Sequence, residues 1–272
     1  MKILYDGDIF LYKHCQAAEE IFSFGEDLQT IVSDSREARQ KMEIHIECIR
    51  KDLEKWLGHS LDILIAFSSG SNFRKTLLPS YKAKRLDKLK PTSFKPVKEW
   101  FLKNYECKVW DGLEADDVLG ILSTVSFDDC IVVSTDKDLQ SIPGFLYNFE
   151  KHKAPHLISR IAADYFHMFQ ALMGDRVDGY FGCPLYGPVK AYRALGPVIG
   201  STVPDLWARV LKAYRASGIS DVDATIQAKV ARILRQGEWD FEKRVSLWEP
   251  PMLVDDATTL KTPIEKMENI AL

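Results

Sequence analysis

Seven acidic side chains that could hold metal ions fall in three short segments of the chain. They are Asp6, Asp8, Glu114, Asp116, Asp117, Asp136 and Asp138. Clustered carboxylates repel one another, and bringing them together costs free energy unless cations neutralise them. Mg²⁺ is the natural cation for such a set because it is hard and prefers oxygen ligands. The alternative is that these acids are ordinary helix N-caps and surface residues.

The elements that must position these acids are the strands of a parallel sheet. Apolar runs predict strands over 2–5, 61–67, 108–110, 130–133 and 145–149, and helices are predicted over 34–57 and 114–125. Strands that alternate with helices indicate an α/β fold with a mostly parallel sheet flanked by helices. Each acid segment follows a strand, and sites in open α/β sheets form outside the carboxyl ends of the strands. We therefore expect all three segments at one edge of the sheet.

The second half of the chain is predicted to be helical. Helices are expected near 161–173, 188–195, 204–216, 224–236 and 240–248, and Pro250-Pro251 ends this region. The predicted organisation is an α/β core over 1–160, a helical region over 161–250 and a tail over 251–272.

Composition excludes several classes of protein. Of the 272 residues, 46% are hydrophobic and 28% are charged, which excludes a disordered chain. No apolar run approaches the roughly 18–20 residues that span a bilayer, and the first residues do not form a signal peptide. The five cysteines are far apart and form no CxxC pair, which argues against a disulfide scaffold and a zinc ribbon. We expect a cytoplasmic protein without a membrane partner.

The absence of other catalytic motifs narrows the chemistry. No Ser-His-Asp or Cys-His arrangement, Walker A loop or glycine-rich dinucleotide fingerprint is evident. Two cations held about 3.5–4 Å apart can activate a water and stabilise the leaving oxygen of a phosphoryl displacement. The acids therefore indicate hydrolysis of a phosphate ester by metal-activated water rather than by a protein nucleophile.

Basic residues are concentrated in a stretch that directly precedes the second acid segment. The net charge is only −3, but residues 74–103 contain ten Lys or Arg and two acids, a local charge of +8. Such a stretch binds phosphates, and together with the acids it suggests metal chemistry on a polyanion. The alternative is a solvated, charged helix face.

A glycine-punctuated turn provides a second candidate phosphate-binding element. Residues 174–191 read as a helix end, a turn containing Gly179, Gly182 and Gly187, and a second helix that starts at Pro188. Glycines let the backbone approach a phosphate, and a helix N-terminus favours an anion. The alternative is an ordinary helical hairpin.

Five motifs, in order and at similar spacing, resemble those of the 5′-nuclease (flap endonuclease) superfamily. They are Asp6-Gly7-Asp8, Asn72-Phe73-Arg74-Lys75 with Tyr81-Lys82-Ala83-Lys84-Arg85, Gly112-Leu113-Glu114-Ala115-Asp116-Asp117, Ser134-Thr135-Asp136-Lys137-Asp138-Leu139, and Gly174-Asp175 with Asp178. Two later stretches, His167-Met168-Phe169-Gln170 and Ala231-Arg232-Ile233-Leu234-Arg235 with Leu247-Trp248, are similar to the stand-alone 5′→3′ exonucleases of short-tailed bacteriophages. The resemblance covers about residues 1–250.

The resemblance implies a PIN-like α/β core with a helical arch at about 74–103 and a helix-two-turn-helix element at about 165–195. It implies cleavage of DNA phosphodiesters near 5′ ends (in duplex, flap or nicked DNA, with RNA–DNA hybrids as a further candidate) and two Mg²⁺ ions, for which Mn²⁺ can substitute. If a phage encodes the chain, the implied location is the cytoplasm of a bacterial host.

The resemblance also implies a role for each matched residue. The ligands of the first ion are Asp6, Glu114 and Asp116, those of the second are Asp136, Asp138 and Asp178, and Asp117 and Asp175 support them through water. Lys82 and Arg85 draw the scissile phosphate toward the ions, and the DNA-binding residues are Arg74, Lys75, Lys84, Gly182, Gly187 and Lys190.

Two positions depart from the family pattern. An aspartate ligand is expected just after Phe67, where this chain has Ser68-Ser69, so water, Asp8 or a neighbouring acid must compensate or the first ion is held less tightly. In the glycine turn, Leu185 stands where the family has a glycine.

Two other functions remain open from the sequence. An aspartyl-phosphate phosphatase is suggested by the early strand that ends in Asp6-x-Asp8. A catalytically weak, structure-specific DNA-binding protein is suggested by Ser69.

Overall fold

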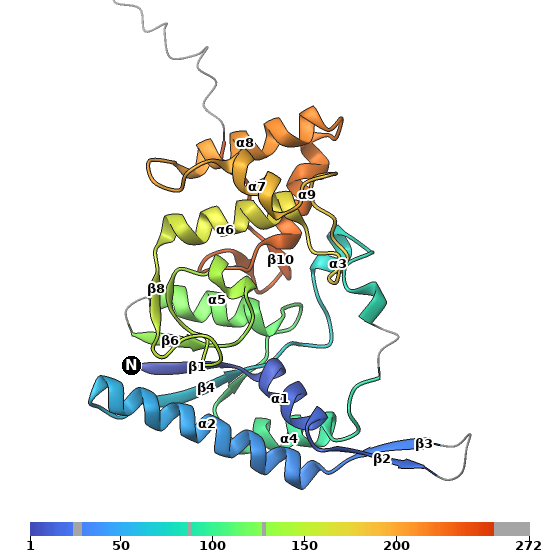
Figure 1. The fold of residues 1–272 in the computed structure, drawn as a ribbon, viewed down its shortest axis with the longest axis vertical. Helices are drawn as coiled ribbons and strands as arrows, with labels where there is room; N and C mark the ends of the chain where they lie inside the picture. Colours follow the sequence, from blue (N-terminus) through green and yellow to red (C-terminus); the bar gives the residue numbers. More distant parts are fainter. Residues whose placement is uncertain (24–28, 86–88, 127–128, 253–272) are drawn as a thin grey trace, which may run out of the picture.

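A six-stranded sheet forms the centre of the molecule in the computed structural model, which describes residues 1–23, 29–85, 89–126 and 129–252 (Figure 1). Its strand order is β5-β4-β1-β6-β7-β8. The strands are β1 (Lys2–Asp6), β4 (Asp62–Ala66), β5 (Cys107–Lys108), β6 (Cys130–Val133), β7 (Gly144–Tyr147) and β8 (His156–Ile158). The first five are parallel and β8 runs antiparallel to β7, so the prediction of a mostly parallel α/β sheet is confirmed.

Alternate residues of the central strands face two separate hydrophobic cores. In β1, Ile3 and Tyr5 belong to one core and Leu4 to the other. The neighbouring strand β6 divides in the same way, with Ile131 on one face and Val132 on the other. Strands buried on both faces must be apolar throughout, which is why they read as continuous apolar runs.

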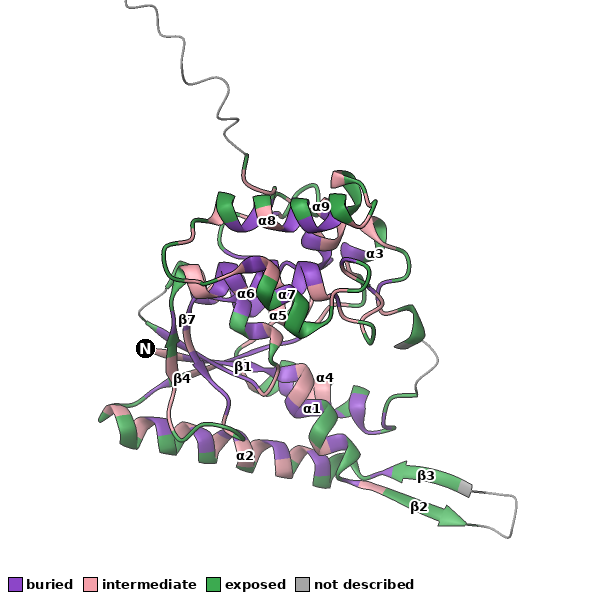
Figure 2. Ribbon diagram, turned by 45° about the horizontal axis from the view of Figure 1, so that its top comes forward, coloured by how far each residue is buried: buried purple, intermediate pink, exposed green. Residues whose placement is uncertain are grey.

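Helices cover both faces of the sheet. On one face lie α1 (Gly7–Gln16), α2 (Ser35–Leu57) and α4 (Phe94–Asn104), and on the other lies α5 (Ala115–Val125) (Figures 1 and 2). Beyond α5, the helices α6 (Arg160–Met173), α7 (Pro188–Leu195), α8 (Val203–Ala216) and α9 (Asp221–Ala231) pack around a third core. The chain therefore enters the helical region only after the sheet is complete.

Short elements complete the described structure. They are α3 (Arg74–Leu77), the 3₁₀ turns η1 (Ala83–Arg85) and η2 (Asp138–Ser141), and the hairpins β2 (Glu19–Ser23) with β3 (Gln29–Ser33) and β9 (Trp239–Asp240) with β10 (Val245–Ser246). The β2–β3 hairpin projects from the body and is largely exposed (Figure 2).

Most predicted helices are present, but two of them differ near the C-terminal end. The helix predicted over 224–236 ends at Ala231, because Arg232 is extended and its guanidinium pairs with Glu238. The prediction of a helix over 240–248 is wrong. That segment forms the β9–β10 hairpin, with left-handed backbone at Gly237 and Arg244 and Trp239 packed against Phe73.

The second half of the predicted arch is part of the core. Phe94, Val97 and Phe101 of α4 are buried in the first core, where α4 packs against α1 and α2. The part of 74–103 that lies outside this core is therefore shorter than predicted, and residues 86–88 of it fall outside the described residues. Most of the predicted tail, 253–272, also falls outside them. The boundaries at 160 and 250 stay a prediction.

Gly120 allows α5 to lie directly against the segment that follows α9. A Cβ atom at Gly120 would come 2.3 Å from the carbonyl oxygen of Leu234. Alanine normally stabilises a helix interior by about 1 kcal/mol relative to glycine. Here we expect Gly120→Ala to lower stability by about 1–3 kcal/mol, because the backbone must move. Chemical denaturation measures this, with Gly70→Ala, where a Cβ meets no atom within 4 Å, as the control. A stabilised Gly120→Ala variant would contradict the packing.

Candidate active site

Asp6 lies at the carboxyl end of the central strand β1 and is almost completely buried, with 1% of its surface exposed. It is also the N-cap of α1, since its Oδ1 accepts a hydrogen bond from the backbone N–H of Ile9 at 3.3 Å. Its Oδ2 accepts a hydrogen bond from the Ser134 hydroxyl at 2.7 Å. Asp6 is thus held at the sheet edge by its own helix and by the loop after β6.

The same serine begins the loop that carries Asp136 and Asp138. Its Oγ accepts a hydrogen bond from the N–H of Asp136 at 3.0 Å, and Asp136 Oδ1 accepts one from the N–H of Asp138 at 2.8 Å. Oδ1 of Asp138 is buried, and the Lys137 ammonium lies 3.3 Å from it. A buried carboxylate oxygen needs positive charge beside it, which this lysine supplies and which a divalent cation could supply instead.

The third acid segment opens α5. Glu114 is the N-cap of α5 and forms a capping box with Asp117. Its side chain accepts hydrogen bonds from the Tyr81 hydroxyl, at 2.7 Å, and from the Lys82 ammonium. Asp116, in the first turn, is partly buried beside Glu114.

Lys82 connects Glu114 to the glycine turn. Its backbone is left-handed (φ 51°), which is uncommon for a non-glycine residue. The Lys82 N–H donates to the carbonyl of Asp178 at 2.7 Å, and its Nζ lies 3.7 Å from Oδ2 of Asp178. Its ammonium lies between two carboxylates from different segments, Glu114 and Asp178.

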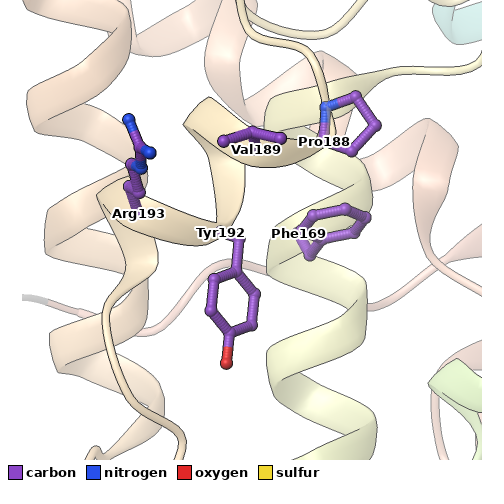
Figure 3. Close-up of a pocket in the computed structure, with 5 residues that line it drawn as sticks. All are labelled: Phe169, Pro188, Val189, Tyr192 and Arg193. Atoms are coloured by element: carbon purple, nitrogen blue, oxygen red, sulfur yellow. The ribbon is translucent and has the colours of Figure 1, made fainter.

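A small cavity of about 20 Å³ lies between the start of α5, the loop after β6 and the glycine turn, and neither Asp6 nor Asp136 lines it. Its polar and charged lining residues are Arg74, Tyr81, Glu114, Asp116, Asp138, Asp178 and Tyr180. A cavity of this size holds about one water-sized particle. A larger cavity of about 370 Å³ lies elsewhere, against α6 and α7, where its lining is apolar apart from Arg193 and Tyr192 (Figure 3). Its composition does not suit phosphate chemistry.

Burial and mutual repulsion raise the pKa of three of the clustered acids. The pKa of Asp6 is raised to about 7, mainly by burial and also by the charges of Asp8 and Asp136, against the lowering effect of the hydrogen bond from Ser134. The pKa of Asp138 is raised to about 6 by burial and by Asp136. That of Asp116 is raised well above its ordinary value by burial and then by Asp6 and Asp136. These effects show that acids from all three segments interact electrostatically.

The pKa of Glu114 is shifted in the opposite direction, below its ordinary value. Burial alone would raise its pKa, but the charges of Lys82 and Arg74 outweigh burial and lower it to about 2. The pKa of Glu114 is lowered and that of Asp116 is raised, although the two carboxylates lie close together. Their different charged partners cause this difference.

The donor set fits a hard divalent cation. The cluster offers carboxylate oxygens and no histidine or cysteine, the chemistry that Mg²⁺ and Mn²⁺ prefer. Among the residues that the structure describes, no three acidic, histidine or cysteine side chains already converge on one point as metal ligands do. The ammonium groups of Lys82 and Lys137 lie among the carboxylates instead, so ligation requires the carboxylates to turn away from them.

Two predicted site residues are placed differently from the prediction. Arg74 was expected to bind DNA, but it is 2% exposed and makes a two-pronged ion pair with Asp117. Asp117 was expected to support a metal ion through water, but it is 0% exposed and both its oxygens accept hydrogen bonds from the protein. Neither group is available to the role that the resemblance implied.

Gly182 is also unsuited to its predicted contact with DNA. Its N–H donates to Gln227 Oε1 at 2.9 Å, and a Cβ would come 2.4 Å from the backbone nitrogen of Gly174. This glycine, with φ 63°, therefore serves close packing inside the turn. Leu185 also has positive φ, 62°, which explains why a glycine suits that position.

The remaining predicted residues have these placements. Asp175 Oδ1 accepts from the N–H of Val177, and its Oδ2 accepts from Lys137 at 3.2 Å. Lys75 and Lys84 are exposed, Gly187 is the N-cap of α7, and Lys190 lies on α7 with its ammonium over the Tyr186 ring. Arg85 is the last residue of η1.

The serines at the departure from the family pattern hold the loop after β4 together. The Ser68 hydroxyl accepts from the N–H of Ala115 at 2.9 Å, and the Ser68 N–H donates to Asp8 Oδ2 at 3.0 Å. The hydroxyl of Ser69 donates to the carbonyl of Ser71. Asp8 therefore reaches the end of β4, beside Asp6.

Sequence reasoning missed Tyr81, Ser134 and Lys137 as site residues. All three stand in the motifs that carry the resemblance, so membership of a motif was a usable signal. The bond from Ser134 to Asp6 was not predictable, because it depends on β1 and β6 being neighbours.

Comparisons with known proteins show the family to which the chain belongs. The family model for the 5′-3′ exonuclease N-terminal resolvase-like domain matches residues 3–147, more than half of the chain. The chain belongs to the 5′-3′ exonuclease family. As the sequence predicts, this membership makes it a 5′→3′ nuclease, and an aspartyl-phosphate phosphatase is not favoured.

Relatives within this family span nearly the whole chain. The exodeoxyribonuclease of Enterobacteria phage T3 is 29% identical over 91% of this chain and 92% of its own length. The exonuclease of Escherichia phage T7 is 28% identical over 91% of this chain and 93% of its own length. A solved structure of the phage T5 5′-exonuclease with zinc matches with a TM-score of 0.52 at 16% identity, covering 85% of this chain and 98% of that one. That similarity supports the same fold for this nuclease. No helix among the described residues is long and apolar enough to cross a membrane.

Protons and divalent ions should compete for the buried acids of this nuclease. A raised carboxyl pKa contributes stability that is present at low pH and lost as pH rises through about 4 to 7, the range set by Asp6 and Asp138. We therefore expect Mg²⁺ to raise Tm little at pH 5 and clearly more at pH 8. Thermal melts with and without Mg²⁺ measure this, and Asp6→Asn should reduce the pH dependence. An increment that is equal at both pH values would contradict the assignment.

Proposed function

We propose that the acid cluster holds two divalent ions, Mg²⁺ with Mn²⁺ as a substitute, and that the enzyme hydrolyses DNA phosphodiesters near 5′ ends. The observation that carries this proposal is that acids from three separate segments, Glu114 with Asp116, Asp138, and Asp178, line one cavity. The pKa values of Asp116 and Asp138 are raised by burial and then by neighbouring acids. The T3 relative is named an exodeoxyribonuclease, and two matched T5 structures contain metal ions, which supports both parts.

The proposed ligands follow the placement of the acids. Asp6, Glu114 and Asp116 would hold the first ion, and Asp136, Asp138 and Asp178 the second, with Asp175 acting through water. Bound ions would supply a water of lowered pKa and stabilise the leaving oxygen. This division of ligands keeps the first set on β1 and α5 and the second on the β6 loop and the glycine turn.

The chain's own cations would act on the scissile phosphate. The Lys82 ammonium lies beside Glu114 and Asp178, two acids that line the small cavity, so it can stabilise negative charge that grows in the transition state. We propose the same role for Arg85.

Other exposed groups would bind the substrate away from the reaction. Lys75 and Lys84 flank Lys82 along the chain, and we propose that they contact the DNA backbone. At the far side of the glycine turn, the N-terminus of α7 at Gly187 and the ammonium of Lys190 offer a second phosphate contact. RNA–DNA hybrids are a further candidate substrate for these sequence-independent contacts.

The experiment that tests this function is a time course on duplex DNA labelled at either the 5′ or the 3′ end. We expect short labelled products from the 5′-labelled strand first, with Mg²⁺ and not with EDTA. Asp136→Ala should lower the rate by on the order of 10³-fold or more, because several kcal/mol of charge stabilisation are lost. DNA binding measured in Ca²⁺ should persist. Metal-independent cleavage, or undiminished cleavage by Asp136→Ala, would contradict the proposal.

The role of Lys82 predicts an effect on turnover. Lys82→Ala should lower kcat by about 10²–10³-fold, the usual effect of losing one group that stabilises transition-state charge, with a smaller change in KM. Lys84→Ala should act mainly on KM, and Lys55→Ala, on the exposed end of α2, is the control. Steady-state kinetics on a 5′-flap substrate separates these cases. A Lys82→Ala variant with normal kcat would remove Lys82 from the reaction.

A further inference from the structure

The Arg74 guanidinium joins three segments of the chain inside the protein. Its Nη1 and Nη2 donate to the two oxygens of Asp117 at 2.6 and 2.7 Å. Nε donates to the carbonyl of Val230 at 2.9 Å, and Nη2 also donates to the carbonyl of Arg232 at 2.6 Å. Arg74 therefore ties the start of α5 to the end of α9 and has no surface left for DNA.

Asp117 is equally enclosed. Besides Arg74, its Oδ1 accepts from the N–H of Leu234 at 3.1 Å, and its Oδ2 accepts from the N–H of Glu114 at 3.2 Å. A carboxylate with these four contacts is saturated. It could reach a metal ion only by releasing a buried arginine, which is costly.

Glu114 is the other carboxylate beside this guanidinium. Its Oε2 lies 3.5 Å from Nη1 of Arg74, compared with 2.6 Å for the Asp117 oxygen on the same nitrogen. The two carboxylates thus compete for one cation. Without the negative charge at 117, the attraction between Arg74 and Glu114 would be the largest that remains for this guanidinium.

We propose that Asp117 is a positioning residue, which takes the short contacts of Arg74 and so keeps the Arg74–Glu114 pair at its longer distance of 3.5 Å. Glu114 then keeps its hydrogen bonds from Tyr81 and Lys82 and the weak Arg74 contact, and it can exchange these partners for a divalent ion. This inference rests on the proposed metal centre. It replaces the sequence-based role of Asp117 as a ligand, because Asp117 acts on the ion only through Arg74 and Glu114. Groups that orient a metal ligand typically change metal affinity about 10–100-fold when they are removed.

The test is Mn²⁺ affinity, measured on the full chain by the electron paramagnetic resonance signal of free Mn²⁺. Asp117→Asn should weaken binding about tenfold or more. The double variant Arg74→Gln/Asp117→Asn should recover to within about threefold of the wild type, since the competing cation is gone. A direct ligand cannot be rescued in this way. Thermal melts of each variant show that it is folded.

Two outcomes would overturn the inference. One is wild-type affinity in Asp117→Asn, and the other is a double variant that binds as weakly as Asp117→Asn or more weakly. If Asp117→Asn does not fold, Arg74→Lys provides a second test. Its single ammonium pairs with Asp117 but cannot reach Glu114 at the same time, so Mn²⁺ affinity should stay within about threefold of the wild type. A tenfold loss would overturn the inference.

The variant Asp116→Ala separates two cases: failure of the Asp117 inference alone, and failure of the proposed metal centre. Asp116 is a proposed direct ligand, so its removal should weaken Mn²⁺ binding whatever Asp117 does. If Asp116→Ala binds Mn²⁺ like the wild type, the proposed metal centre and the inference are both overturned. If only the Asp117 result fails, the metal centre stands.

Discussion

Repulsion between buried carboxylates is the constraint on which the active site depends. Asp6 and Asp116 are placed by parallel strands and by a helix start, and the fold gives them no freedom to separate. Burial and proximity both disfavour their ionised forms, so they either keep protons or need cations. The edge of the sheet where these acids lie therefore favours bound cations, which is why we propose it as the catalytic site.

Cationic side chains of the protein neutralise part of this negative charge, and they are of two kinds. Lys82 and Lys137 lie among the acids with partly exposed ammonium groups, which can exchange partners. Arg74 is buried, and its short hydrogen bonds go to Asp117 and to backbone carbonyls, with Glu114 at a longer distance. The first kind of cation can share carboxylates with divalent ions and substrate, whereas the second kind fixes the framework that presents them.

Particular residues show how far prediction from the sequence reached. The runs at 61–67 and 130–133 are buried strands, and the acid segments lie at one sheet edge, because apolar runs and the rule for strand ends are local and general. The helix predicted at 240–248 failed because Trp239 is anchored on Phe73, a contact between distant segments. The arch was predicted to include α4 because its lysines were counted with the basic stretch, whereas its apolar face packs in the core.

The sequence by itself determined which carboxylates follow which strands and where the basic stretch lies. It also determined that the chain belongs to a nuclease family. Only the tertiary structure decided which charges face each other. Arg74 and Asp117 both belong to motifs that suggest contact with ligands, yet they neutralise one another in the interior. Residues 74, 117 and 230–234 are far apart along the chain, so the pairing depends on how the helical region packs over α5, and no local pattern records that.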